Sequence, residues 1–127
     1  MAAAKSRTSI WSAHSVATGS TQSSPDSSAW IDLSTAYGGQ LDLRITNGTS
    51  APSVGLQVQI VVAADGSHTL PTAFGGAFIG GTTASEVDYL SVEIPIGVNS
   101  LQLQAFYASN PTNAVTVDAD ISVVTSV

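Results

Sequence analysis

The sequence contains no cysteine, little charge and no long hydrophobic run. Without cysteine there is no disulfide bond, no thiolate metal site and no thiol chemistry. Small secreted domains often depend on disulfides, so their absence favours folding in a reducing cytoplasm. No apolar run approaches the ~20 residues that span a bilayer. We therefore expect no membrane-spanning segment.

Charged residues make up 9% of the chain, and only three of them are cationic, for a net charge of −6. Binding to nucleic acid needs clustered lysine and arginine to neutralise phosphates, and anionic membrane surfaces make a similar demand. The composition therefore predicts neither nucleic acid nor membrane as a partner. Uncharged polar residues carry the solubility instead, and they suit protein interfaces whose centres are depleted in charge.

The first nine residues are small and polar, and they include the cations Lys5 and Arg7. They predict a flexible N-terminal arm over residues 1–9 that could reach an acidic neighbour in an assembly. A single domain over residues 10–127 follows, since the length suits one domain. The basic start is not followed by an apolar segment, so we expect no secretion signal. Release from the cell would then require assembly, lysis or a dedicated machine.

Apolar and polar residues alternate along much of the chain, which predicts half-buried β-strands. No helical period occurs. The expected strands cover residues 10–17, 29–33, 40–46, 54–63, 87–94, 100–108 and 114–127, with a short one near 77–79. Seven to eight regularly spaced strands predict an all-β fold, an antiparallel two-sheet β-sandwich that is immunoglobulin-like or a jelly roll.

Residues 67–85 form the most irregular segment, with a proline and two glycine pairs. One interpretation is a long connection between the two sheets. Another is a mobile loop that becomes ordered against a partner, as long loops in compact domains often do. Its apolar residues Phe74, Phe78 and Ile79 could instead fold back onto the core.

Residues that could carry chemistry are scattered. His14 and His68 have no second histidine nearby, whereas a zinc site needs three or four convergent ligands. Asp118 and Asp120 share a strand face but lack the oxygen-rich loop that calcium requires. The nucleophile motif G-x-S-x-G does not occur. We therefore predict no catalytic, cofactor-binding or metal-binding residues and no cofactor.

Trp11 and Trp30 are the largest candidate contact residues. The alternation places Trp30 on the face opposite Ile31 and Leu33, exposed or buried in a neighbouring subunit. Three interpretations stay open for the tryptophans: packing in the core or at an edge, anchoring a protein interface, or stacking on a ligand such as a sugar. The tyrosines that could join them are Tyr37, Tyr89 and Tyr107.

Several stretches combine strand and turn residues in a recognisable way. They are Leu41–Gly48, Gln57–Ile60, Asp65–Ser67, Val92–Val98 and Leu101–Leu103. Through them, residues 40–127 resemble the small β-sandwich capsid decoration, or cement, proteins of tailed bacteriophages. The resemblance rests on strands and turns and includes no catalytic signature.

The resemblance implies a non-enzymatic virion protein that assembles in the host cytoplasm and decorates the outer capsid surface. It would bridge neighbouring subunits of the major capsid protein, as a homo-oligomer that is a trimer or dimer, through many weak contacts. The expected partner-binding residues are Lys5, Arg7, Trp11, Trp30, Phe74, Phe78 and Ile79. The alternatives are a carbohydrate- or receptor-binding module of a phage fibre and a tail or neck structural component.

Overall fold

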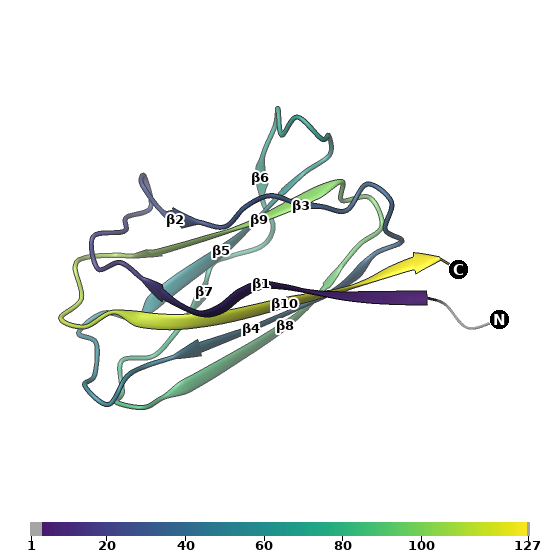
Figure 1. Cartoon of the computed structure of the whole chain (residues 1–127). Coiled ribbons are helices and arrows are strands. Elements are labelled where there is room, and N and C mark those ends of the chain that lie inside the picture. Colours follow the sequence, from purple (N-terminus) through teal and green to yellow (C-terminus); the bar gives the residue numbers. More distant parts are fainter. Residues whose placement is uncertain (1–3, 127) are drawn as a thin grey trace.

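The computed structural model describes residues 4–126 and consists of two antiparallel β-sheets packed face to face (Figure 1). The predicted all-β sandwich is confirmed. Six strands have eight or more residues: β1 (Ala4–Val16), β4 (Gly39–Thr46), β5 (Leu56–Ala63), β8 (Val87–Ile94), β9 (Ser100–Tyr107) and β10 (Val115–Ser126). Four have two residues each: β2 (Asp26–Ser27), β3 (Ile31–Asp32), β6 (Thr72–Ala73) and β7 (Phe78–Ile79).

The strand order identifies the sandwich as a jelly roll. One sheet has the order β1-β10-β4-β8. In the other, β9 and β5 pair centrally, β2 and β3 both pair with β9, and β6 and β7 both pair with β5. If each of these broken pairs counts as one interrupted strand, eight strands remain in the jelly-roll order. This order decides between the two topologies that the sequence left open, and the count agrees with the expected seven to eight.

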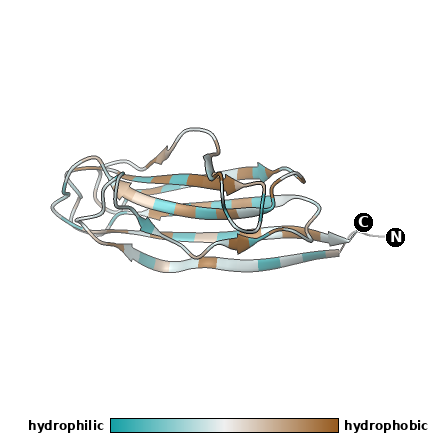
Figure 2. Ribbon diagram, turned by 90° about the horizontal axis from the view of Figure 1, so that it is seen from above, coloured by the Kyte–Doolittle hydropathy of each residue, from teal (hydrophilic) through white to brown (hydrophobic). Residues whose placement is uncertain are grey.

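The core lies between the sheets and is built by the alternation that predicted the strands. In β4, Leu41, Leu43 and Ile45 are buried while the intervening side chains are exposed. Figure 2 shows the same alternation of hydrophobic and hydrophilic residues along the strands. Because successive side chains of a strand point to opposite sides, each sheet turns one apolar face inward and one polar face outward.

The predicted N-terminal arm differs from the structure. Residues 4–9 form the first part of β1, which pairs antiparallel with β10 from Ala4↔Ser126 to Val16↔Val115. Their side chains are exposed, which explains the polar composition, but their backbone extends the sheet beside β10. Residues 1–3 of the predicted arm lie outside the described residues. An edge strand with only backbone pairing leaves no apolar pattern in the sequence.

β1 is irregular in its middle. The register shifts between Ser9 and Trp11 and again between Trp11 and His14, and Ala13 has a left-handed φ of 46°. The backbone N–H of Ala13 donates to the carboxylate of Asp118 at 2.8 Å. Bulges of this kind re-aim side chains, so the simple alternation expected for residues 10–17 does not hold and Trp11 turns into the core.

Candidate binding surfaces

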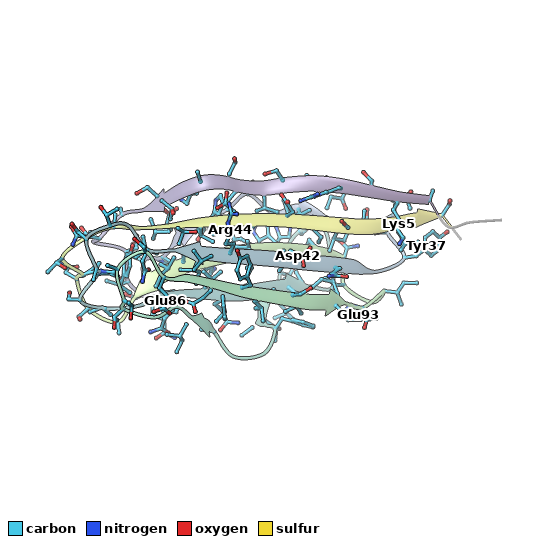
Figure 3. The ribbon with its side chains drawn as sticks, turned by 90° about the horizontal axis from the view of Figure 1, so that it is seen from below. Lys5, Tyr37, Asp42, Arg44, Glu86 and Glu93 are labelled. Carbon is cyan, nitrogen blue, oxygen red and sulfur yellow. The ribbon has the colours of Figure 1, made fainter. Side chains whose placement is uncertain are left out.

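The first candidate surface is the polar face that the four-stranded sheet turns to solvent, which we call the outer face. Asp42 and Arg44 of β4 lie on it, as Figure 3 shows. The side chains that form it come from all four strands: Arg7, Ser9, Gln40, Asp42, Arg44, Tyr89, Ser91, Glu93, Asp118, Asp120 and Ser122.

Ion pairs across neighbouring strands neutralise part of this face. Arg44 of β4 donates from Nη2 to the carboxylate of Asp118 on β10 at 2.9 Å. The guanidinium of Arg7 on β1 pairs with Asp120. The hydrogen bond from the Ala13 N–H, and then the bonded Arg44, hold the pKa of Asp118 below its ordinary value. Two of the chain's three cations are therefore used within the outer face.

A third carboxylate of the outer face is satisfied without a cation. The hydroxyl of Ser91 donates to Asp42 at 2.7 Å, and the amide of Gln40 donates to Ser91 at 2.6 Å and to Asp42 at 3.2 Å. Asp42 lies directly opposite Asp120 on β10. Like charges in this position repel, and the Ser91 and Arg7 partners offset that repulsion.

The centre of the outer face is shallow and offers an aromatic ring. Tyr89 of β8 is 72% exposed. It borders an open hollow of about 360 Å³ that Arg44 and Trp11 also line. The outer face thus offers Tyr89 and two arginines, residue types that are enriched at protein interfaces, among aspartate and serine side chains that interfaces use less often.

β8 is a free edge of this sheet. Among the described strands it pairs only with β4, in an uninterrupted register from Val87 to Ile94. It contains no proline, lysine or bulge, although it carries Asp88 and Glu93, and charged side chains are one of the devices that limit pairing at an edge. Val87 and Tyr89 are both exposed along it. The opposite edge strand, β1, is interrupted by three register shifts, two of them in its middle.

The second candidate surface lies at one end of the six-stranded sheet and is defined by an aromatic pair. The indole of Trp30 stacks on the imidazole of His68, with ring centroids 4.0 Å apart and planes 7° from parallel. Both side chains are half-buried. They border an open hollow of about 360 Å³, which we call the Trp30 hollow and which is lined by Trp30, Asp32, Ser34, Gly66, His68, Asn99 and Ser100.

Three chain segments meet at the Trp30 hollow because β3, β9 and β5 are neighbours. Asp32 pairs with Ser100, and Ser100 pairs with Ala63 at the end of β5. The backbone of Asn99 is held on both sides: its carbonyl accepts from the Leu33 N–H at 2.7 Å and its N–H donates to Ala63 at 3.1 Å. The hollow is therefore built on ordered backbone.

The turn that carries His68 is held in an unusual conformation. His68 has a φ of 55°, in the left-handed region that residues other than glycine seldom adopt. Asp65 accepts hydrogen bonds from the hydroxyl and the backbone N–H of Thr69, and these bonds lower the pKa of Asp65. The turn thus positions the imidazole beside Trp30.

The basic residues expected to contact a partner are both exposed and lie on β1. Lys5 borders an open hollow of about 710 Å³ that Tyr37 also lines, near the end of the sandwich where the termini lie (Figure 3). Arg7 lies on the outer face and is paired with Asp120. Trp11 was expected beside them at the surface but is 9% exposed and belongs to the core.

The other expected contact residues do not form one surface. Trp30 lies at the Trp30 hollow. Phe74 and Phe78 pack against the core, so they fold back on it, as one of the alternatives held. Ile79 is 61% exposed at the end of β7. The segment 67–85, for which a mobile loop was one interpretation, contains β6 and β7, which pair with β5.

Sequence reasoning weighed His68 only as a metal ligand, and it named Tyr89 among the tyrosines that could join a contact surface without selecting it as a contact residue. His68 has no neighbour in sequence that signals its stacking on Trp30, since their proximity depends on β3, β9 and β5 lying together. Tyr89 could have been selected, because it alternates with the apolar residues of β8 and so must face solvent.

Two further findings concern residues 4–126. No three histidine, aspartate or glutamate side chains in this part converge as a metal site would require. The same residues include no helix with the length and apolarity to cross a membrane.

Comparison with known proteins identifies the fold. No protein-family model matches the chain, and no curated protein matches it in sequence. The solved structure of the SPBc2 prophage-derived protein YomS is similar over 96% of each chain, with a TM-score of 0.50 and 13% identity. The K3 cleaved adhesin domain of Lys-gingipain from Porphyromonas gingivalis gives a TM-score of 0.46 and 12% identity, over 91% of this chain and 69% of that one. At these identities the likeness concerns the fold.

Proposed function

We propose that this chain is a non-enzymatic structural protein of a bacteriophage particle that decorates and stabilises the outer surface of the capsid. It binds the major capsid protein at junctions between neighbouring subunits, after assembly in the host cytoplasm. The similar fold of a prophage-derived protein supports a phage origin. Jelly rolls also occur widely in viral capsid proteins, although a fold alone does not determine a function.

The observation that carries the proposal is the outer face. It is broad and polar, its charges are largely paired with each other, and Tyr89 stands exposed near its centre. Pairing reduces the cost of burying this face but does not remove it, because ion pairs also lose hydration at an interface. Contacts of this kind are weak singly. Many copies on one capsid lattice would bind by avidity.

We further propose that the chain acts as a homo-oligomer, a dimer or trimer, in which β8 takes part. Its backbone groups on the free edge can pair with a strand of another copy, which extends the sheet across the interface. Val87 and Tyr89 would then lie at the junction. Lys5 and Arg7 on β1, and Ile79 on β7, remain exposed for contacts with capsid subunits.

The first experiment is size-exclusion chromatography with light scattering on the pure protein, followed by co-sedimentation with empty capsids of the matching phage. We expect a stable oligomer that co-sediments in stoichiometric amounts. A variant with Val87→Lys and Tyr89→Lys should lose both properties. The matched control is Leu70→Lys, which replaces another exposed apolar residue and should change neither. A monomer that ignores capsids would refute the proposal.

A tail or neck protein is the competing structural function. Labelling the chain in intact virions separates the two, because decoration places the label over the whole head and a tail component places it at one vertex. A carbohydrate- or receptor-binding function is the second candidate, and the aromatic pair at the Trp30 hollow is the observation that favours it.

A further inference from the structure

We propose that the Trp30 hollow binds a neutral saccharide through the Trp30 and His68 rings and the polar side chains beside them. This activity is separate from decoration of the capsid and uses the opposite sheet. On a virion it would give each decorating copy a weak attachment point for glycans.

The two rings stack face to face at the rim of an open hollow, so each ring covers one face of the other and the outer faces of the stack form the platform. Pyranose rings present flat C–H faces that pack on aromatic rings, and aromatic side chains combine large contact area with few lost rotamers. Trp30 and His68 are only half-buried, so part of the platform is open to a ligand.

The other tryptophan–histidine stack of the chain shows that stacking alone does not make a site. Trp11 and His14 also stack, with centroids 4.8 Å apart. Trp11 is buried in the core, and His14 is bonded to Asp26 at 2.7 Å, which joins β1 to β2. The His14–Asp26 bond therefore joins the two sheets. The His68 ring, in contrast, forms no hydrogen bond to any described residue.

The left-handed backbone at His68 is a second, independent observation. Strained conformations at residues other than glycine are costly and cluster at functional sites. Glycine at this position would relieve the strain, and the turn already contains Gly66. The imidazole side chain is therefore present at an energetic cost. This backbone conformation places the His68 ring on Trp30 at the rim of the hollow.

Polar groups suited to sugar hydroxyls surround the platform. Asp32 uses one carboxylate oxygen to accept from the Ser34 N–H at 2.9 Å. The Ser34 side chain also bonds this carboxylate, which keeps further lone pairs for a ligand. The side-chain amide of Asn99 has no hydrogen-bond partner among the described residues. The Asp32 carboxylate accepts hydrogen bonds, and the Asn99 side-chain amide both donates and accepts them. Together they match two adjacent hydroxyl groups of a pyranose. Hydrogen bonds to a charged carboxylate are stronger than neutral ones.

The charges and dimensions of the site restrict the ligand class. The chain carries a net charge of −6 and Asp32 lies in the lining, so uronic or sialic acids would be repelled and neutral sugars favoured. A hollow of about 360 Å³ is at the small end of ligand sites, which suits one or two sugar rings. Because the backbone of Asn99 is already bonded on both sides, binding costs little ordering.

The test is a titration of the whole protein with glucose, galactose, mannose and N-acetylglucosamine and their disaccharides, after a glycan-array screen to select among them. Tryptophan fluorescence is the readout, since the chain has two tryptophans and Trp11 is buried. We expect a change in Trp30 emission that saturates. Trp30→Ala should weaken binding about tenfold or more, because the stacking contact is lost.

Asn99→Ala keeps the folded platform intact and should also weaken binding, which preserves the test if Trp30→Ala fails to fold. Tyr89→Ala on the outer face is the matched control and should bind sugar as the parent does. Capsid co-sedimentation should survive Asn99→Ala, so failure here and failure of the decoration proposal are distinguishable. Absence of binding to every sugar in the array and the titration, or equal binding by the Asn99 variant, would overturn the proposal.

Discussion

Tyr107→Phe tests the buried hydrogen-bond bridge that closes one end of the sandwich. Tyr107 on β9 is 2% exposed. Its hydroxyl donates to the carbonyl of Val16 at 2.9 Å and accepts from the N–H of Val115 at 3.0 Å. These two residues are the last paired positions of β1 and the first of β10. One side chain of the six-stranded sheet thus bonds to β1 and β10, two neighbouring strands of the other sheet.

Phenylalanine keeps the ring and removes only the hydroxyl, so the packing loss is small. The variant leaves one buried carbonyl and one buried N–H without this partner, and each orphaned group costs about 1–3 kcal/mol. Part of this destabilisation is offset, because the phenylalanine variant no longer has to desolvate a hydroxyl group when it folds. We expect a loss of about 2 kcal/mol in the free energy of unfolding, which for a chain of 127 residues lowers the Tm by roughly 7 °C.

The measurement is thermal and urea unfolding of parent and variant, with Tyr37→Phe as control because Tyr37 is 48% exposed. Burial raises the pKa of Tyr107 above its ordinary value near 10. A raised pKa contributes stability that is complete below the unfolded value and is lost as the pH rises through the folded one. The parent should therefore lose its advantage over the variant above about pH 10. Equal Tm values at pH 7 would refute the reasoning.

Three further predictions concern backbone and charge. Gly39→Ala should lower the Tm markedly, because its Cβ would come within 2.3 Å of the carbonyl oxygen of Ser122 on β10, whereas Gly97→Ala meets no neighbour and should be neutral. Ala13→Gly should raise stability by up to about 1 kcal/mol in urea unfolding, since it relieves the left-handed φ. Asp118→Asn should destabilise the fold at pH 7 but progressively less in acid. The lowered pKa of Asp118 contributes stability that is present above the ordinary pKa of 3.8, and this stability is lost as the pH falls through the folded pKa.

Each of these predictions has an outcome that contradicts it. Gly39→Ala with an unchanged Tm would mean that β4 and β10 are further apart than described. A destabilised Ala13→Gly would show that unfolded-state entropy outweighs the backbone strain. For Asp118→Asn, an effect of equal size at pH 2 and pH 7 would show that the carboxylate charge does not contribute.

The local pattern of the sequence was sufficient for the long strands. The expected ranges for β4, β8, β9 and β10 agree with the structure within a residue or two, because each has one face against the core and therefore strict alternation. For β1 the expected strand began only at residue 10, and the first part was missed because its side chains are exposed on both faces. Of the two-residue strands, β3 and β7 lie within the expected ranges 29–33 and 77–79, whereas β2 and β6 were not expected.

The binding surfaces depend on contacts that are distant in sequence. Trp30 and His68 are brought together by the neighbouring positions of β3, β9 and β5, and Arg7 meets Asp120 only because β1 folds back along β10. A single sequence records which residues are apolar. It does not record which strands pair, and so the partners of individual polar side chains stay hidden.

The sequence by itself therefore determined the class of fold, the alternating core and the absence of cysteine chemistry, because these follow from residue type and spacing along one chain. The tertiary structure decided the jelly-roll order, the free edge of β8, the burial of Trp11 and the ring platform at Trp30. The physical reason is that strand pairing is set by the summed packing of both sheets, in which most contacts join residues far apart in the chain.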